Sequence, residues 1–217
     1  MLSEQKAKQL RQVAEAWPAS KPDFKPNTSK WFGHFHEQVF ANVLQSKPNG
    51  IYLELGTWTG AGSTRFVSRA FPSMTVICVD TFAGSPEHLR DPQQKLIAAN
   101  LWSIFCVNRW EERERIFPIK KPSVAGMRLV AEQDVAPDFI YIDAAHDADS
   151  VFADLEAALT LFPKAVVFGD DYVKPGKGHT GVYDALERAK KQKLISAKEI
   201  NTVNRVWYLT RNLAWKR

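Results

Sequence analysis

Apolar residues recur at helical spacing in the first fifty residues and then gather in short, separate runs. One stripe of residues 3–17 is apolar, which predicts a short amphipathic helix. Its members are Leu10, Val13, Ala14 and Trp17. After a proline- and lysine-rich connector, Thr28 or Ser29 is the expected N-cap of a second helix, which stops near Pro48-Asn49-Gly50. The apolar face of this second helix comprises Phe32, Phe35, Val39, Phe40, Val43 and Leu44.

From residue 51 the pattern changes to short apolar runs that alternate with longer amphipathic segments. The runs predict strands at 51–55, 74–79, 115–119, 139–142 and 165–168. The segments between and after them predict helices at 63–70, 93–105, 123–132, 150–161 and 182–192. Strands that are apolar almost throughout are buried on both faces, which indicates a parallel sheet between two layers of helices. The tail predicts two more strands, 193–200 and 203–211, joined through Asn201-Thr202 as an antiparallel hairpin.

These elements predict a doubly wound α/β domain at residues 50–217, preceded by a helical cap at residues 1–49. In such a sheet, ligands bind beyond the carboxyl ends of the strands, so the residues that follow each strand are the first candidates for a site. The cap helices, with residues 82–92 and 172–180, are expected to form a lid and an acceptor pocket, because loops vary most between functions on one fold.

Composition agrees with one folded domain in a reducing compartment. The chain has 217 residues, 45% of them hydrophobic, enough to build a core without disulfides or a structural metal. Cys78 and Cys106 lie in apolar runs, which suits free thiols. No apolar run is long enough for a membrane-spanning helix, and the first residues have no signal-peptide core, so a cytoplasmic location is expected.

The net charge of +5 changes this picture little, because the basic residues are scattered. The densest basic group is expected to be a solvated helix face. It comprises Arg188, Lys190, Lys191 and Lys193. Without a basic stripe interleaved with aromatic residues, nucleic acid is not the expected partner.

A glycine-rich turn follows the first predicted strand. Gly56, Gly60 and Gly62 let the backbone turn tightly and approach a ligand. A dinucleotide fingerprint would need a further glycine where Trp58 stands, and no phosphate-binding loop is present. The turn therefore predicts a nucleoside ligand without a diphosphate. Asp80, at the end of the second strand, is expected to hold the ribose hydroxyls.

Three carboxylates follow two further strands. Asp143 comes after the fourth strand, and Asp170 and Asp171 come after the fifth. Like charges this close destabilise one another unless a cation or a proton intervenes, and oxygen ligands favour a hard ion such as Mg²⁺. In the competing interpretation, Asp171 caps the following loop and Asp143 touches only the cofactor.

Histidines offer two further candidates. His146 lies three residues after Asp143 and is a candidate general base, with a structural role at the start of a helix as the alternative. His34 and His36 have metal-ligand spacing but no nearby cysteine or histidine partners, so both are interpreted as structural or substrate-facing.

Taken together, these motifs resemble the class I S-adenosylmethionine-dependent methyltransferases. Within that class, the chain looks like the metal-dependent O-methyltransferases of the macrocin O-methyltransferase and cephalosporin-hydroxylase-like group. The resemblance covers about residues 50–190. It rests on residues 54–63 (ELGTWTGAGS), 79–82 (VDTF), 142–146 (IDAAH) and 169–172 (GDDY).

The resemblance implies a seven-stranded Rossmann-like sheet with its last strand antiparallel, and it implies roles for individual residues. Asp80 would bind the ribose, His146 would be the base, and Asp143, Asp170 and Asp171 would hold the metal. The cofactor would be bordered by Glu54, Gly56, Thr57, Trp58, Gly60, Ser63, Asp80, Thr81 and Asp143. The chain departs from the family where Ala144 replaces a usual glycine, and where Ala145 replaces the aspartate that macrocin-type relatives use.

The leading functional hypothesis is therefore transfer of a methyl group from S-adenosylmethionine to a hydroxyl of a small molecule or sugar, assisted by Mg²⁺ or another divalent ion. A metal-independent methyltransferase of the same fold remains an alternative. So does a nicotinamide-binding oxidoreductase, against which Trp58 argues. A homo-oligomer is compatible with the apolar surface of the cap helices.

Overall fold

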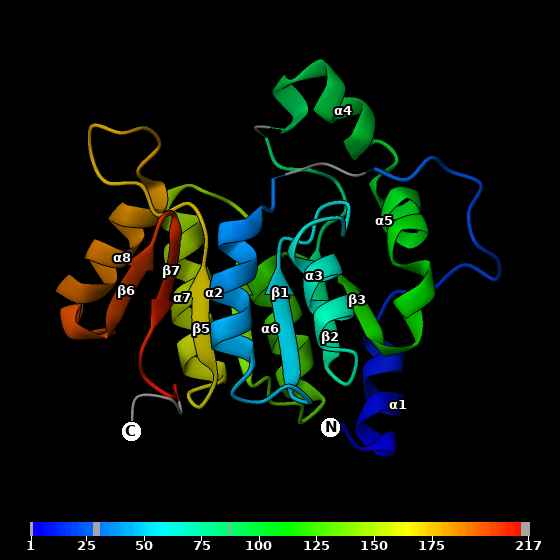
Figure 1. Ribbon diagram of the computed structural model, residues 1–217, viewed down its shortest axis with the longest axis horizontal. Coiled ribbons are helices and arrows are strands. Elements are labelled where there is room, and N and C mark those ends of the chain that lie inside the picture. The colour runs from blue at the N-terminus through cyan, green and yellow to red at the C-terminus, as the bar shows by residue number, and fades with distance from the viewer. Residues whose placement is uncertain (1, 28–30, 87, 214–217) are drawn as a thin grey trace.

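A seven-stranded sheet organises the protein, whose computed structural model describes residues 2–27, 31–86 and 88–213 (Figure 1). The strand order is β3-β2-β1-β4-β5-β7-β6. The first five strands in that order are parallel, whereas β7 is antiparallel to both β5 and β6. This topology confirms the expected fold. The strands are β1 (Ile51–Leu55), β2 (Thr75–Asp80), β3 (Ile116–Lys120), β4 (Phe139–Ile142), β5 (Val166–Gly169), β6 (Ile200–Val203) and β7 (Val206–Leu209).

Helices cover both faces of this sheet. Figure 1 shows α2 (His34–Leu44) and α3 (Ser63–Ala70) in front of the strands, with α6 (Ser123–Glu132) and α7 (Ala148–Leu161) behind them. The front layer also includes α5 (Leu101–Arg109), and the rear layer includes α8 (Gly181–Lys191). The strand side chains alternate between the two layers: Leu53 and Leu55 face the rear core, and Tyr52 faces the front core. The strands are therefore buried on both faces, as predicted.

The two N-terminal helices lie in different parts of the molecule. Helix α1 (Glu4–Val13) packs beside β3 and buries Leu10 in the rear core. Helix α2 buries Phe40 in the front core, against the rings of Tyr141 and Phe168 at 4.7 and 4.9 Å. Residues 1–49 thus contribute to both layers of the domain core.

Three local expectations were wrong. The helix predicted at 93–105 is two helices, α4 (Pro92–Ala98) and α5, because the chain turns at Asn100, whose side chain donates to the carbonyl oxygen of Leu96. The hairpin turns at Asn204-Arg205 rather than at Asn201-Thr202, because Asn204 adopts the left-handed conformation that a two-residue turn requires. Residues 193–199 form a turn and a short 3-10 helix, Ala197–Glu199, instead of a strand.

The second helix also begins later than the periodicity indicated. It starts at His34 after Gly33, and the expected caps Thr28 and Ser29 fall outside the described residues. Phe35 was assigned to the apolar face but is 62% exposed, because it lies in the first turn, before the part of α2 that is buried in the core (Val39–Leu44). The first helix also ends sooner than predicted, at Val13.

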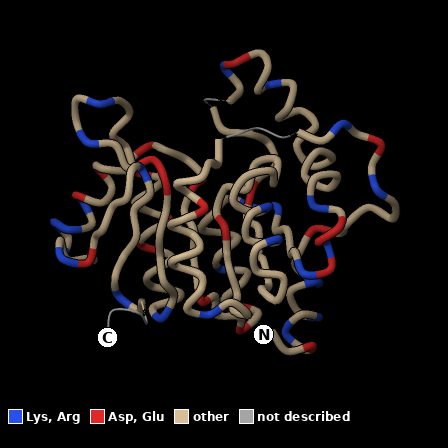
Figure 2. Tube along the Cα trace, in the orientation of Figure 1, with Lys and Arg blue, Asp and Glu red and all other residues tan. Residues whose placement is uncertain are grey.

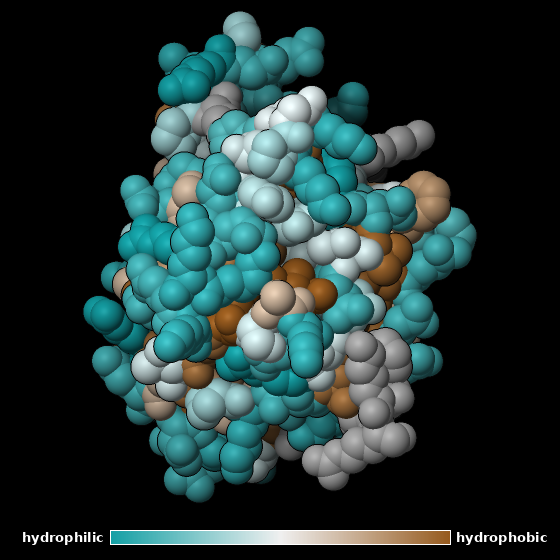
Figure 3. Space-filling view, turned by 90° about the vertical axis from the view of Figure 1, so that its left-hand side faces the viewer, coloured by the Kyte–Doolittle hydropathy of each residue, from teal (hydrophilic) through white to brown (hydrophobic). Residues whose placement is uncertain are grey.

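The surface agrees with the charge pattern. Lysine and arginine residues are spread over the described trace (Figure 2). Hydrophilic side chains cover most of the face at the α8 and β6 edge (Figure 3). No helix within the described ranges has the length and apolar character needed to cross a bilayer. Cys78 and Cys106 are buried and unpaired, as expected.

Candidate active site

A cavity of about 780 Å³ opens at the carboxyl ends of β1, β2, β4 and β5. Most of the predicted site residues line it. They are Gly56, Thr57, Trp58, Ser63, Asp80, Thr81, Asp143, His146, Asp170 and Asp171. The topology brings these residues together, because parallel strands end at the same edge of the sheet.

The glycine turn is shaped by close backbone contact between neighbouring strands. Gly56 has a φ of +82°, and a Cβ there would lie 2.1 Å from the carbonyl oxygen of Asp143. Only glycine fits this position. Trp58 also has a positive φ, of 48°, which is a strained conformation for a bulky residue. The surrounding hydrogen bonds maintain this strained loop beside the cavity.

Asp80 supplies those hydrogen bonds. Its Oδ2 accepts from the backbone amides of Thr57 and Trp58 at 2.9 and 2.8 Å, and its Oδ1 accepts from the amide of Phe82 at 2.7 Å. Burial raises the pKa of Asp80, and these three hydrogen bonds oppose that shift. Asp80 therefore organises the glycine turn as well as lining the cavity, a role that its position in the sequence did not indicate.

Two predicted cofactor residues, Glu54 and Gly60, are not among the cavity-lining residues. Glu54 is fully buried in β1, where it accepts hydrogen bonds from the hydroxyls of Ser63 and Thr64. Burial raises the pKa of Glu54 to about 8. Gly60 packs against the ring of Phe105. Glu54 therefore contacts the cavity through Ser63, and Gly60 packs into the front core.

Asp143, His146 and Asp171 form a compact group of potential ligands. The Nε2 atom of His146 lies 3.6 Å from Oδ1 of Asp143 and 3.1 Å from Oδ2 of Asp171. Burial raises the pKa of Asp143; the contact with His146 opposes this shift and the charge of Asp170 adds to it. Asp171 also pairs with Arg205, which the β6–β7 turn brings to the cavity. Asp171 has a φ of 59° and is, after Trp58, a second residue of the site with a strained backbone.

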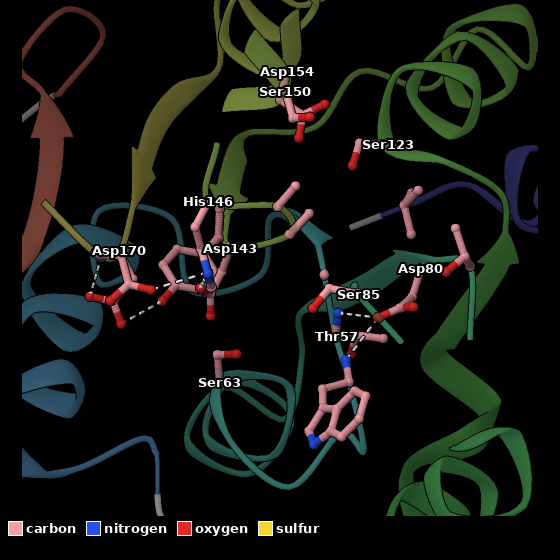
Figure 4. A pocket seen from close by; sticks show the side chains of 18 of the residues that line it. Thr57, Ser63, Asp80, Ser85, Ser123, Asp143, His146, Ser150, Asp154 and Asp170 are labelled. Atoms are coloured by element: carbon pink, nitrogen blue, oxygen red, sulfur yellow. Dashed lines mark hydrogen bonds and ion pairs between the residues drawn. The ribbon is translucent and has the colours of Figure 1, made fainter. Parts of the chain in front are cut away.

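Asp170 faces a different partner. Its Oδ2 accepts from Nε2 of His36 at 2.8 Å, and its Oδ1 accepts from the backbone amide of Asp171 at 2.7 Å. The hydroxyl of Tyr141 lies 3.5 Å from the same Oδ2. The hydrogen bond to Asp170 raises the pKa of His36. Figure 4 shows Asp170 on one side of the cavity and Asp80 on the other, with Asp143 and His146 between them.

The donor chemistry fits a divalent cation. One ligand atom from each of Asp143, His146 and Asp171 lies within 4.8 Å of the others, a spacing that a single ion could bridge. Asp170 follows β5 directly and lines the same cavity. Carboxylates are the preferred ligands of Mg²⁺, and imidazole is also accepted by several transition metals.

The sequence did not reveal several residues that line the cavity. Asp154 on α7 is buried near Ser150 and Ser123, away from Asp143 and Asp170 (Figure 4). Burial raises the pKa of Asp154 to about 7. The ring of His88 stacks on Trp58 at 4.0 Å and on Trp31 at 5.7 Å. Asp154 and His88 carry no local motif. Arg205 stands in a turn that was placed incorrectly.

The expected lid is only partly present around this cavity. Trp31 and Phe32, before α2, line it, as do Gly84, Ser85, Pro86 and His88. Helix α1 and residues 172–180 are not among the described lining residues, because α1 lies beside β3 and the loop after β5 extends from the sheet near α8 (Figure 1).

Comparison with known proteins identifies the class. Residues 53–172, more than half of the chain, match the family described as "Methyltransferase domain". The chain belongs to this family, and with its sheet order it is a class I S-adenosylmethionine-dependent methyltransferase. The nicotinamide-binding alternative is thereby set aside. No curated protein sequence gives a significant match.

Solved structures share the fold at low sequence identity. CalS11, a calicheamicin methyltransferase, is 16% identical with a TM-score of 0.56, over 96% of this chain and 93% of that one. An O-methyltransferase from Bacillus cereus in complex with SAH is 19% identical with a TM-score of 0.53, over 96% and 91%. MycE from the mycinamycin biosynthetic pathway, solved with Mg and SAH, is 15% identical with a TM-score of 0.53. The match spans 85% of this chain and only 52% of MycE.

Proposed function

We propose that the protein transfers the methyl group of S-adenosylmethionine to a hydroxyl oxygen of a small molecule or sugar in the cytoplasm, with the help of a divalent cation such as Mg²⁺. The observation that carries the proposal is the convergence of Asp143, His146 and Asp171 in the cavity that also contains the glycine turn. The names of the similar structures support it, since they include an O-methyltransferase and a methyltransferase solved with Mg.

The glycine turn is proposed to hold the cofactor. Gly56, Thr57, Trp58, Ser63 and Asp143 border the methionine side, and Asp80 with Thr81 borders the ribose. Three of the four lone-pair sites on the Asp80 carboxylate accept backbone amides, and one is left for a ribose hydroxyl. Glu54 is proposed to act through Ser63, whose hydroxyl it binds, and Gly60 through the shape of the turn.

The three aspartates at the ends of β4 and β5 are proposed to bind the cation that activates the methyl acceptor. Asp143, Asp170 and Asp171 are the proposed cation ligands, and His146 is the proposed base. A divalent cation bound there would lower the pKa of the acceptor hydroxyl and orient it. The imidazole of His146 would then receive the hydroxyl proton, and Asp171, whose Oδ2 lies 3.1 Å from Nε2, would stabilise the resulting imidazolium. The remaining task of the protein is to hold the acceptor oxygen in line with the transferred methyl group, about 3–3.5 Å away.

The proposal predicts that metal is needed for catalysis and not for cofactor binding. Methyl transfer from labelled S-adenosylmethionine to a panel of phenols and sugars should fall about 100-fold on chelation or in Asp170→Ala, because second-shell changes alone often cost 10- to 100-fold. Binding of S-adenosylhomocysteine, measured by calorimetry, should hold its affinity. Asp149→Ala is the matched control, since that side chain is 90% exposed. Full activity of Asp170→Ala in chelator-treated protein would contradict the metal-assisted mechanism.

One observation favours a metal-independent methyltransferase as the second candidate. Arg205 pairs with Asp171 and His36 pairs with Asp170, so the chain itself supplies positive groups to two of the three carboxylates. In that case proximity alone would drive transfer. Activity that chelation leaves unchanged, and that falls in Arg205→Ala, would favour this candidate.

A further inference from the structure

His36 brings the N-terminal segment into the candidate active site. It lies in the first turn of α2, and its side chain is only 20% exposed. Its Nδ1 accepts a hydrogen bond from the backbone amide of Gly33 at 3.1 Å. An imidazole that accepts at Nδ1 carries its proton at Nε2, so the start of the helix determines the tautomer.

The protonated Nε2 is directed at Asp170. The 2.8 Å hydrogen bond to Oδ2 joins two largely buried side chains, since that of Asp170 is 15% exposed. The other carboxylate oxygen accepts from the amide of Asp171. Donors on both oxygens determine how the carboxylate is turned. The Tyr141 hydroxyl also reaches Oδ2, at 3.5 Å, so Oδ1 keeps a lone pair for a further partner.

The neighbouring histidine on the same helix behaves differently. The side chain of His34 is 76% exposed, and it contacts Gln38 and Glu37 on its own helix. The ring of His36 instead lies 5.1 Å from the ring of Phe32, which lines the same cavity. The contact with Asp170 is therefore specific to His36, and His34 provides a matched control.

We propose that His36 is a positioning residue of the methyl-transfer site, which orients the Asp170 carboxylate toward the cation and makes the N-terminal segment part of the active site. The inference rests on the proposed function, in which Asp170 is a cation ligand. Hydrogen-bonded partners of metal ligands orient those ligands, and their loss commonly weakens metal binding. Within the described residues, the hydrogen bonds of His36 go to Gly33 and Asp170 and not to the glycine turn, so cofactor binding should not depend on it.

Calorimetric titration with Mn²⁺ and, separately, with S-adenosylhomocysteine tests this role. His36→Ala should weaken Mn²⁺ binding about 10- to 100-fold, and His36→Gln, which keeps a donor near the position of Nε2, should recover affinity to within about threefold. His34→Ala should match the wild type, and S-adenosylhomocysteine should bind all four proteins equally. Unchanged Mn²⁺ affinity in His36→Ala overturns the proposal. So does a parallel loss of cofactor affinity that glutamine does not restore, because that marks a merely structural role.

Failure of the metal-assisted mechanism can be distinguished from failure of the positioning role of His36. If the wild type binds no Mn²⁺, the metal-assisted mechanism fails, and crystal structures of the wild type and the two His36 variants decide the positioning role. The proposal expects the Asp170 carboxylate to keep its orientation in the wild type and in His36→Gln, and to turn in His36→Ala. An Asp170 that keeps its orientation in His36→Ala overturns the proposal.

Discussion

At the scale of single residues, Glu54 is an ionisable side chain that is fully buried in β1. Burial raises the pKa of its carboxyl from 4.5 to about 8, although hydrogen bonds from Ser63 and Thr64 act in the other direction. The folded protein therefore keeps a proton that the unfolded chain releases between these two pH values. The free energy of unfolding should fall as the pH rises through this window, by up to about 1.4 kcal/mol per pH unit.

Replacing this carboxyl by an amide should remove the contribution of Glu54 to the pH dependence of stability. We expect Glu54→Gln to make the fall of unfolding free energy with pH less steep between 4.5 and about 8, while other buried carboxyls such as Asp154 keep their share of the slope. Urea unfolding across this window measures the slope for each protein. Glu156→Gln, an exposed substitution on α7, should leave the wild-type slope unchanged. Equal slopes for wild type and Glu54→Gln would mean that Glu54 is ionised in the folded protein.

Two glycines with nearly the same φ allow the cost of backbone strain to be distinguished from the cost of a steric clash. Gly56 and Gly176 have φ values of +82° and +83°, but a Cβ at Gly56 would collide with the backbone of Asp143, whereas nothing lies within 4 Å of one at Gly176. Gly176→Ala should cost only the left-handed strain, about 1–2 kcal/mol. Gly56→Ala should cost clearly more and also weaken binding of S-adenosylhomocysteine. Urea unfolding and calorimetry measure both effects, and similar losses in the two variants would show that the glycine turn can relax.

At the scale of elements, α2 links the core to the site. Phe40 is fully buried and its ring packs on Tyr141 of β4, two residues before Asp143. Phe40→Ala should lower the unfolding free energy by about 3–5 kcal/mol, because it leaves a cavity between helix and sheet. Phe35→Ala on the exposed face should change it by about 0.5 kcal/mol or less. Comparable effects of the two substitutions, measured by urea unfolding, would contradict the packing of α2.

The elements also show where local pattern is sufficient. Strands β1 and β4 and helices α3 and α6 were predicted at their observed bounds, because a short apolar run and an amphipathic segment are both local signals. The break at Asn100 and the turn at Asn204 were missed. Each depends on the backbone conformation of one asparagine, which the surrounding structure allows. The periodicity of the flanking residues does not predict that conformation.

At the scale of the whole molecule, stability and binding are separated in space. Leu10 is fully buried in the rear core beside β3, whereas the cavity lies at the carboxyl ends of the strands. Leu10→Ala should therefore lower the unfolding free energy by about 2–5 kcal/mol and leave the affinity for S-adenosylhomocysteine unchanged. Urea unfolding and calorimetry test the two halves of this prediction. A marked loss of affinity would instead give α1 the lid function that the sequence suggested.

The chain's own pattern of apolar and polar residues determined the sheet, its helical layers and the edge at which Asp80, Asp143, Asp170 and Asp171 gather. This was possible because a strand that is buried on both faces has a continuous run of apolar residues, and because the carboxyl ends of parallel strands lie at the same edge of the sheet. Tertiary structure alone decided which partners those carboxylates find. His36 and Asp170 are 134 residues apart in the sequence, and Arg205 and Asp171 are 34 apart. Contacts across such separations depend on how whole elements pack, and no local pattern records them.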